Sequence, residues 1–241
     1  SRWIEEKGRR ESWPETIERY INFIEKHQKN VPKKTIRKIR QYVTDFEVMP
    51  SMRMLWAAGP AAERDNTCIY NCAFANIDSI ESFAECLHIL MCGTGFGFSV
   101  SEENISKLPE VPPMTVKRIP DYEVDDSKEG WADSVKHLMQ TLYRGRHVHF
   151  DYSKLRPEGA RLSTMGGRSS GPAPLIRLHQ FIREVFGKAQ GRKLNTIECH
   201  DICNQIAEIV VSGGVRRSSQ ISLSDLDDEE MRHAKDWPFP L

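Results

Sequence analysis

The sequence has few cysteines for its length, no excess charge of either sign and no long apolar run. Its 241 residues include six cysteines, mostly in apolar stretches, which argues against a disulfide-stapled secreted protein and favours a reducing, cytoplasmic location. The 34 basic residues balance 34 acidic ones, so no overall field attracts nucleic acid or a membrane surface. No window of about 18 apolar residues predicts a membrane-spanning helix.

The first 48 residues predict a helical region. The opening SRWIEEKGRR is neither a signal peptide nor a plausible start of translation, so we expect the chain to begin partway through a longer protein. Ser12 and Glu15 form a capping box, with Pro14 in the first turn of the helix that follows. A second amphipathic helix is expected over residues 35–46.

Residues 66–100 predict an α/β unit and hold four of the six cysteines. Residues 67–74 are expected to form a buried strand after a turn-forming Arg-Asp-Asn triplet. Residues 80–91 carry apolar side chains at helical spacing, and the glycine-rich turn after them leads into another apolar strand. The order strand, helix, strand is typical of the α/β class. Further helices are expected from about residue 131 and over residues 175–189.

Two loops carry groups that suit an anionic ligand. Residues 49–60 combine a proline, small residues and one arginine, and can offer backbone N–H groups and a cation to a phosphate; an ordinary interdomain turn has the same composition. Residues 156–175 are rich in glycine, arginine and serine, which fits either nucleotide contact or a solvent loop.

The cysteine spacing leaves a zinc site open as an alternative. Cys68 and Cys72 are four residues apart, and so are Cys199 and Cys203. This spacing fits a helix better than a zinc knuckle, in which two residues usually separate the ligands.

Six segments occur in the same order as in a known family: PSMRMLWAAGP, DNTCIYNCAF, LMCGTGFGFSV, RPEGARLSTMGGRSSGP, IECHDICNQI and VSGGVRRSSQISLSDL. Together they resemble the adenosylcobalamin-dependent ribonucleoside-triphosphate reductases, which are class II ribonucleotide reductases of the monomeric type. The resemblance covers almost the whole chain, and six segments in register make it specific.

The resemblance implies a fold, a cofactor and a reaction. The fold would be a helical N-terminal region, residues 1–48, followed by the first half of a ten-stranded α/β barrel, residues 49–241. In this family, homolysis of adenosylcobalamin generates a thiyl radical that attacks the ribose 3′ carbon, and a cysteine pair supplies the reducing equivalents. The elements that bind the cobalamin would lie mostly in the absent C-terminal half.

The resemblance also assigns site residues. Cys68 would be the first member of the redox-active pair, and Ser51, Met52 and Arg53 would lie against the substrate's phosphates. The implied effector-binding residues are Asp78, Ser79, Ile80, Asp126, Lys128, Glu129 and Trp131. The implied specificity loop comprises Gly166, Gly167, Arg168, Ser169, Ser170 and Gly171. Arg216 and Arg217 are expected either to bind a phosphate or to hold the barrel together, and no resident metal is implied.

The implied partners are a ribonucleoside triphosphate, a deoxynucleotide effector, a thioredoxin-type reductant and a complementary C-terminal half. The resemblance places the family's radical cysteine, its partner acid and its second redox cysteine on a later finger loop and strand, in a motif like NPCGE, and nothing in this sequence matches that motif. We therefore expect this chain alone to be inactive, as a fragment or one piece of a split or intein-interrupted enzyme. Two alternatives are a catalytically inert nucleotide-binding regulatory module and a zinc-bound structural or interaction domain.

Overall fold

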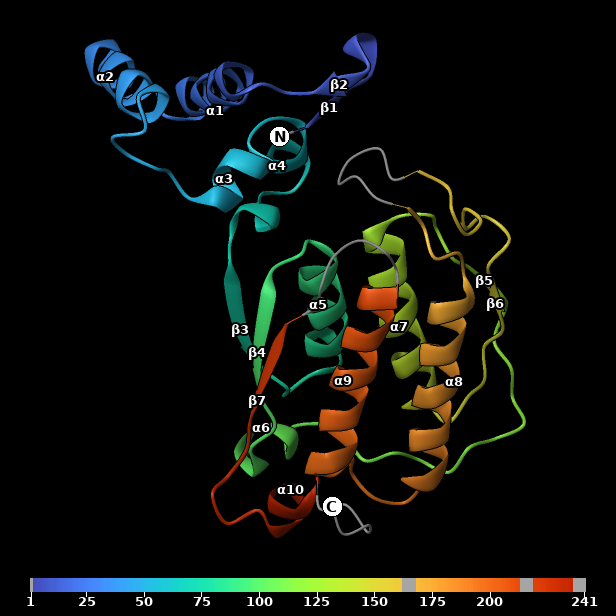
Figure 1. Ribbon diagram of the computed structural model, residues 1–241. Helices are drawn as coiled ribbons and strands as arrows, with labels where there is room; N and C mark the ends of the chain where they lie inside the picture. Colours follow the sequence, from blue (N-terminus) through green and yellow to red (C-terminus); the bar gives the residue numbers. More distant parts are fainter. Residues whose placement is uncertain (1, 162–167, 213–218, 236–241) are drawn as a thin grey trace, which may run out of the picture. The chain divides into compact units, whose positions relative to one another are not determined.

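The computed structural model describes residues 2–161, 168–212 and 219–235, which are drawn in colour in Figure 1. The chain divides into two compact units, residues 1–71 and residues 72–241. The sequence predicted a boundary after residue 48, whereas the structure groups the next 23 residues, up to residue 71, with the helical unit. Helices and parallel strands are both present, which confirms the predicted α/β class.

The first unit is mainly helical. Helices α1 (Trp13–His27) and α2 (Lys33–Thr44) confirm the two predicted helices, although α2 starts and ends two residues before the predicted range. Their shared core consists of Ile17, Ile21, Ile36 and Val43. The smaller elements are the strands β1 (Trp3–Ile4) and β2 (Arg9–Arg10), the 3-10 turn η1 (Glu5–Lys7), the helices α3 (Met52–Ala57) and α4 (Pro60–Arg64), and the 3-10 turn η2 (Asn66–Ile69).

The predicted capping box starts α1. The Glu15 carboxylate accepts hydrogen bonds from the Ser12 backbone N–H at 2.8 Å and from the Ser12 hydroxyl at 3.0 Å. Pro14 occupies the first turn, where its missing N–H removes no intrahelical bond. These local signals explain why the helix begins at Trp13.

The second unit places helices beside a small parallel sheet. The sheet has the order β3-β4-β7, formed by β3 (Cys72–Asn76), β4 (Gly95–Ser99) and β7 (Gln220–Leu223). The helices are α5 (Ile80–Met91), α6 (Glu102–Ile105), α7 (Lys128–Leu142), α8 (Ala173–Lys188), α9 (Thr196–Ser212) and α10 (Glu229–His233). Two short strands, β5 (Tyr122–Glu123) and β6 (Phe150–Asp151), form a separate parallel pair. No helix in the described ranges has both the length and the apolar character needed to cross a bilayer.

The strand predicted at residues 67–74 is wrong in its first half. The Asp65 carboxylate accepts a hydrogen bond from the Thr67 N–H at 3.0 Å and starts the 3-10 turn η2, so β3 begins only at Cys72. Side chains of this type favour turns because they satisfy nearby backbone donors without a sheet partner. Cys68 therefore lies in a turn and not on the predicted barrel strand.

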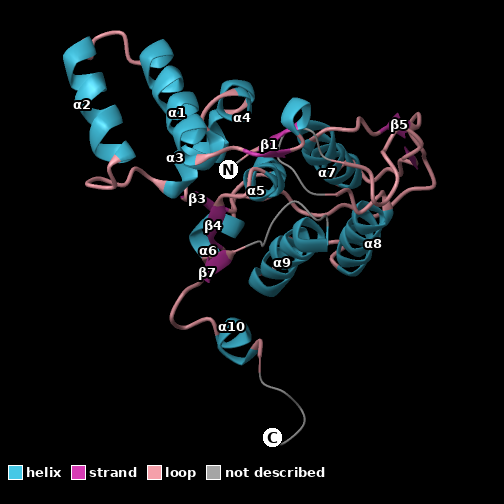
Figure 2. Cartoon of the chain, turned by 45° about the horizontal axis from the view of Figure 1, so that its top comes forward, coloured by secondary structure: helices cyan, strands magenta, loops and turns pink. Residues whose placement is uncertain are grey.

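Among the described residues of the second unit, helices cover one face of the sheet. On that face Ser222 of β7 lies 3.0 Å from His200 of α9, and Gln220 donates to Cys86 of α5 at 3.2 Å. Figures 1 and 2 show α5 and α9 on the same side of the three strands. The main core of the unit lies between the sheet and α5, α7, α8 and α9.

The opposite face of the sheet carries exposed apolar side chains. Phe74 is 56% exposed and Ile221 is 63% exposed, and both lie in register with Gly97 between them. A Cβ at Gly97 would lie 3.0 Å from the Phe74 ring and 3.3 Å from Ile221, so the two side chains lean over the glycine. Strands β3, β4 and β7 thus form an open sheet, and the described strands do not confirm the predicted first half of a ten-stranded barrel.

Candidate functional site

The predicted substrate segment lies at the start of the short helix α3. Ser51 is the N-cap, and its hydroxyl accepts a hydrogen bond from the backbone N–H three residues later at 3.5 Å. Met52 is 73% exposed, whereas Arg53 is buried. The Arg53 Nε donates to the carbonyl oxygen of Tyr70 at 3.3 Å. Arg53 therefore ties this segment to the chain that follows η2.

Cys68 lies close to the same segment. The residue is buried in η2, which packs against both α3 and α4. The Arg53 hydrogen bond reaches Tyr70, two residues beyond Cys68, across the same group of turns. The structure thus brings the predicted redox cysteine and the predicted substrate segment together within the first unit.

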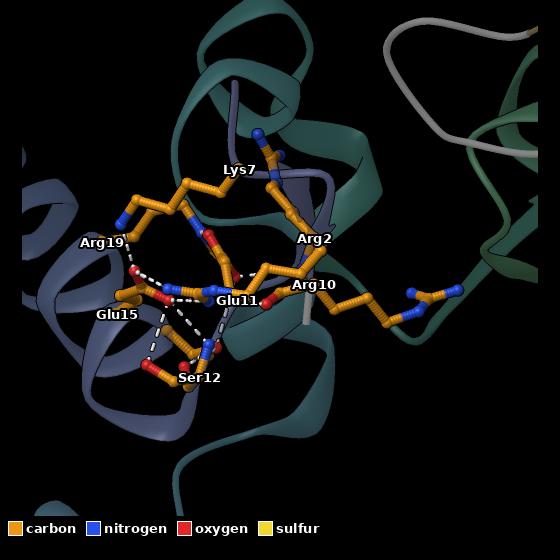
Figure 3. Close-up of polar contacts among 9 residues, drawn as sticks. Arg2, Lys7, Arg10, Glu11, Ser12, Glu15 and Arg19 are labelled. Carbon is orange, nitrogen blue, oxygen red and sulfur yellow. Dashed lines mark hydrogen bonds and ion pairs between the residues drawn. The ribbon is translucent and has the colours of Figure 1, made fainter. Parts of the chain in front are cut away.

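A charged network holds α3 against α1, and Figure 3 shows its charged residues Glu11 and Arg19. Arg19 donates to the Glu11 carboxylate at 2.7 and 2.9 Å and to the carbonyl oxygens of Leu55 and Ala58 at 2.9 and 2.5 Å. Burial raises the pKa of Glu11, but hydrogen bonds from Arg19 and from the Arg2 backbone N–H outweigh it and lower that pKa to about 2. The ionised pair therefore positions the end of α3, directly after the predicted substrate segment.

An open groove of about 470 Å³ also lies on the first unit. Its charged lining consists of Glu15, Glu18, Glu63, Arg19 and Lys26, and Lys26 forms an ion pair with Glu63. Three carboxylates in this lining repel phosphate groups. The groove therefore does not suit the expected nucleotide.

Helices α5 and α7 of the second unit are antiparallel neighbours (Figure 1). Glu81, near the start of α5, forms an ion pair with Lys136 in the second half of α7 at 3.0 Å. At the other end, Lys128 at the start of α7 donates to the sulfur of Cys92, the C-cap of α5, at 3.0 Å. Because α5 and α7 are antiparallel, the start of α7 lies beside the end of α5, and this places the predicted effector residues.

Asp78, Ser79 and Ile80 lead into α5. Ser79 is the N-cap, and its hydroxyl accepts from the Ser82 backbone N–H at 3.3 Å. The Asp78 carboxylate accepts from the Ser82 hydroxyl at 3.3 Å and lies 3.9 Å from Lys107 Nζ. The polar groups of this segment therefore serve the helix cap.

The second predicted effector segment surrounds the start of α7. Asp126 accepts a hydrogen bond from Arg156 Nε at 2.7 Å. Lys128 contacts Cys92, and Glu129 lies in the first helical turn. Trp131 is partly buried and packs against the main core.

The two predicted effector segments lie at opposite ends of the α5–α7 pair. Residues 78–80 precede α5, whereas residues 126–131 lie beside its C-terminal end. Twelve helical residues separate these ends by roughly 18 Å. The structure therefore does not bring the seven predicted effector residues into one site within this unit.

Part of the predicted specificity loop is described. Gly166 and Gly167 lie outside the described residues, as do Arg216 and Arg217. Arg168 donates to the Gly159 carbonyl oxygen at 2.9 Å, and the Ser169 N–H donates to the Ala160 carbonyl oxygen at 2.8 Å. Ser170 and Gly171 complete the described part, and Gly171 has a φ of +69°, which favours glycine. These bonds fix the base of the loop.

Arg156 is a site residue that the sequence reasoning missed. Besides its contact with Asp126, it donates to the carbonyl oxygen of Arg161 at 3.5 Å, at the base of the predicted specificity loop. It therefore joins the second effector segment to that loop. Its position at the start of the segment RPEGARLSTMGGRSSGP was the only sequence signal for it.

A buried histidine network stabilises the helices behind this region. The Ser134 hydroxyl donates to the Trp131 carbonyl oxygen at 2.7 Å, so it accepts from His179 Nε2 at 3.1 Å. The other ring nitrogen, Nδ1, then accepts from the Tyr152 hydroxyl at 2.7 Å. Burial lowers the pKa of His179 to about 3, so the ring is neutral in this tautomer.

The four cysteines of the zinc alternative are not clustered in the second unit. Cys72 is exposed on β3, whereas Cys199 and Cys203 are buried on α9. Burial raises the pKa of the Cys199 thiol, and burial together with the neighbouring Cys86 raises that of Cys203. Buried neutral thiols of this kind pack as small apolar groups and are poor zinc ligands.

Comparisons with known proteins agree with the resemblance seen in the six segments. A family model described as "B12-dependent ribonucleotide reductase, insertion domain" matches residues 113–186. The adenosylcobalamin-dependent ribonucleoside-triphosphate reductase of Euglena gracilis is 28% identical over 96% of this chain and 35% of its own length. The enzyme of the same name from Lactobacillus leichmannii is 29% identical over 95% of this chain and 40% of its own length.

A solved structure extends the likeness to the fold. The crystal structure of a B12-dependent (class II) ribonucleotide reductase matches 98% of this chain with a TM-score of 0.79 and 25% identity. The match covers 42% of that protein, so this chain spans well under half the length of its relatives. By sequence and by fold, the chain is similar over nearly all of its length to part of the B12-dependent, class II ribonucleotide reductases.

Proposed function

We propose that this chain is the N-terminal portion of a cytoplasmic ribonucleotide reductase that uses adenosylcobalamin to convert ribonucleoside triphosphates to 2′-deoxyribonucleotides. The observation that carries the proposal is the near-complete coverage of the chain by a class II reductase fold. Curated relatives with adenosylcobalamin in their names cover the same span. The chain alone is proposed to be inactive and to need a complementary C-terminal half.

Cys68 is proposed as one thiol of the redox-active pair. Loss of the ribose 2′ hydroxyl as water requires two electrons and two protons. Oxidation of two thiols to one disulfide releases both, and a thioredoxin-type dithiol then restores the pair. The second thiol would come from the remainder of the protein. The position of Cys68 beside α3 supports this role because that helix starts at the proposed substrate segment.

Ser51, Met52 and Arg53 are proposed to face the substrate's phosphates, with different tasks. Arg53 is buried and bonded to the Tyr70 carbonyl, so its task is to hold the segment beside η2. Ser51 sets the start of α3, and the exposed Met52 is free to cover the nucleotide. Adenosylcobalamin would initiate the radical chemistry, and we assign none of its contacts to this chain.

Effector recognition is proposed for the start of α7 and the specificity loop, residues 166–171. Asp126, Lys128 and Glu129 lie in or just before the first turn of α7, and Arg156 connects Asp126 to the loop base. A deoxynucleotide bound here would act on the loop through that arginine. Asp78, Ser79 and Ile80 would belong to a separate surface at the far end of α5.

Two single cysteine substitutions in the complete enzyme test the redox assignment. Cys68→Ser is expected to abolish repeated turnover with adenosylcobalamin and a thioredoxin-type reductant, whereas Cys72→Ser is the matched control and retains it. The readout is deoxynucleotide formed per enzyme over many turnovers. Unchanged steady-state activity of Cys68→Ser would refute the role. Effector binding by this chain without any activity in the complete protein would favour the regulatory-module alternative.

A further inference from the structure

Cys92 lies beside two basic side chains in the second unit. Lys128 Nζ is 3.0 Å from its sulfur, and His88 Nε2 is 3.7 Å from the same atom. Cys92 itself is fully buried, whereas Lys128 and His88 are half-buried. His88 is one helical turn before Cys92 on α5, and the antiparallel packing of α7 brings Lys128 to the sulfur. The three side chains therefore form a cluster fixed by two helices.

Lys128 and His88 are the groups that would stabilise a thiolate at Cys92, whose full burial by itself favours the neutral thiol. A neighbouring lysine or histidine stabilises a thiolate, and charge-assisted hydrogen bonds are short, as this one is. The ammonium group lies at the C-terminal end of α5, where the helix dipole attracts a cation but disfavours an anion at the C-cap Cys92, so it is the lysine and not the dipole that stabilises a thiolate. Cys86 offers a contrast on the same helix, because its sulfur accepts from the neutral amide of Gln220 and lies beside the thiol of Cys203, with no cation among these contacts.

We propose that Cys92 and Lys128 form a peroxide-sensitive pair, which closes a covalent sulfenamide bond between Sγ and Nζ. The oxidant is hydrogen peroxide, and the bond links α5 to α7. The modification does not depend on the proposed reductase activity, although Lys128 is also one of the residues proposed for effector recognition.

The first step oxidises the sulfur. The thiolate attacks peroxide, the O–O bond breaks, and one oxygen remains on sulfur as a sulfenic acid. The other oxygen leaves as hydroxide and takes a proton from the Lys128 ammonium to form water. The sulfur loses two electrons and the peroxide gains them, and Lys128 becomes a neutral amine.

The second step joins the two side chains. The Lys128 nitrogen attacks the sulfenic sulfur, an S–N bond forms, and the S–O bond breaks. The leaving hydroxide takes a proton from the nitrogen, so a second water is released. The resting N···S distance of 3.0 Å is already within the range of a near-attack arrangement. An external thiol reverses the reaction by displacing the nitrogen, and a second thiol then restores Cys92.

Mass spectrometry of the purified protein tests the proposal. After mild peroxide treatment we expect the mass of the chain to fall by two hydrogens, with no oxygen added. Digestion at glutamate residues should then yield one peptide pair joined between Cys92 and Lys128, and dithiothreitol should separate it. Circular dichroism before and after treatment checks that the fold is kept.

Matched variants separate the two roles of Lys128, its positive charge and its attacking amine. Lys128→Arg keeps the cation but removes the attacking amine, so Cys92 should still be oxidised to a dimedone-reactive sulfenic acid without a cross-link. Cys92→Ser should give neither product. Cys86→Ser and Lys136→Arg are the controls, and both should cross-link as the parent protein does.

Three results would overturn the proposal. One is a stable sulfenic acid on Cys92 of the parent protein without a bond to Lys128. Another is a disulfide from Cys92 to a second cysteine as the main product. The third is oxidation of Cys92 no faster than that of Cys86, measured in the same peptide map.

Discussion

Arg156 Nε donates to the Asp126 carboxylate at 2.7 Å, across 30 residues of sequence. The same guanidinium reaches the Arg161 carbonyl oxygen at 3.5 Å. A planar guanidinium can hold two such acceptors at once, which a lysine ammonium on a flexible stem does less well. The pair therefore connects the start of α7 to the base of the proposed specificity loop.

Replacement of Arg156 by lysine should weaken effector binding. We expect the dissociation constant for a deoxynucleoside triphosphate to rise about tenfold, which corresponds to about 1.4 kcal/mol. Isothermal titration calorimetry on the protein measures the change. Arg118→Lys is the matched control, because Arg118 forms an exposed ion pair with Asp121 at 2.6 Å. Equal effects of both substitutions would contradict a connecting role for Arg156.

Glu11→Gln should destabilise the first unit. The substitution leaves the Arg19 guanidinium without its anionic partner, and we expect the free energy of unfolding to fall by about 2 kcal/mol. Hydrogen exchange of the α1 and α3 amides reports on this unit directly. Glu18→Gln is the control, since Glu18 pairs with Arg40 at the surface.

Glu11→Gln should also change how the stability of the first unit depends on pH. The pKa of Glu11 is about 2 in the folded state, below its ordinary value of 4.5. Its contribution is therefore fully present above pH 4.5 and is lost as the pH falls towards 2. The glutamine variant should lack this loss of stability in acid. If the free energy of unfolding of both proteins changed with pH in the same way, the Glu11–Arg19 pair would not be its cause.

His179 should make the second unit less stable in mild acid. Its pKa is about 3 when folded and 6.5 in the unfolded chain, so between these values only the unfolded chain binds the proton. The free energy of unfolding should therefore fall by about 1.4 kcal/mol for each pH unit below 6.5. Hydrogen exchange of the α7 and α8 amides at pH 7, 6 and 5 measures the slope.

A glutamine at position 179 serves as the comparison. His179→Gln keeps a donor and an acceptor for Ser134 and Tyr152 but does not titrate. It should lower stability at pH 7 and flatten the slope between pH 6.5 and 5. A slope as steep as that of the parent protein would assign the acid sensitivity to other groups.

Gly130→Ala and Gly187→Ala should have opposite effects on stability. A Cβ at Gly130, in the first turn of α7, would lie 2.4 Å from the Asp125 carbonyl oxygen, so the backbone must shift at a cost of about 1–3 kcal/mol. Gly187, in α8, has nothing within 4 Å of the added carbon, so alanine should stabilise that helix by about 0.5–1 kcal/mol. Chemical denaturation of both variants measures whether each substitution lowers or raises the free energy of unfolding. Destabilisation by Gly187→Ala would contradict the open space there.

Local signals predicted the helices well. The apolar positions of residues 80–91 predicted α5, which spans Ile80–Met91, and the capping box of Ser12 and Glu15 predicted the start of α1. Helix α7 begins at Lys128, three residues before its first predicted residue, because Ser127 acts as the N-cap. The hydroxyl of Ser127 accepts from the Gly130 N–H at 2.9 Å, and this cap explains the earlier start.

Contacts between distant residues could not be predicted in this way. Nothing in the sequence shows that Arg156 meets Asp126 or that Lys128 meets Cys92, because both pairs depend on how α5, α7 and the loops pack. The strand expected at residues 67–74 failed for a different reason, since the Asp65 carboxylate accepts a hydrogen bond from the Thr67 N–H and caps a turn where extended backbone was expected. The assignments of Cys68 and of the effector residues remain proposals drawn from the resemblance.

The connections of the three-stranded sheet imply an order of assembly. Strands β3 and β4 are joined through the single helix α5, whereas β7 pairs with β4 only after three longer helices have intervened. Closing the longer loop costs more chain entropy before any pairing energy is gained. During synthesis the first two strands can therefore pair early, and the neighbouring edge of β4 waits unpaired until the last third of the chain has emerged.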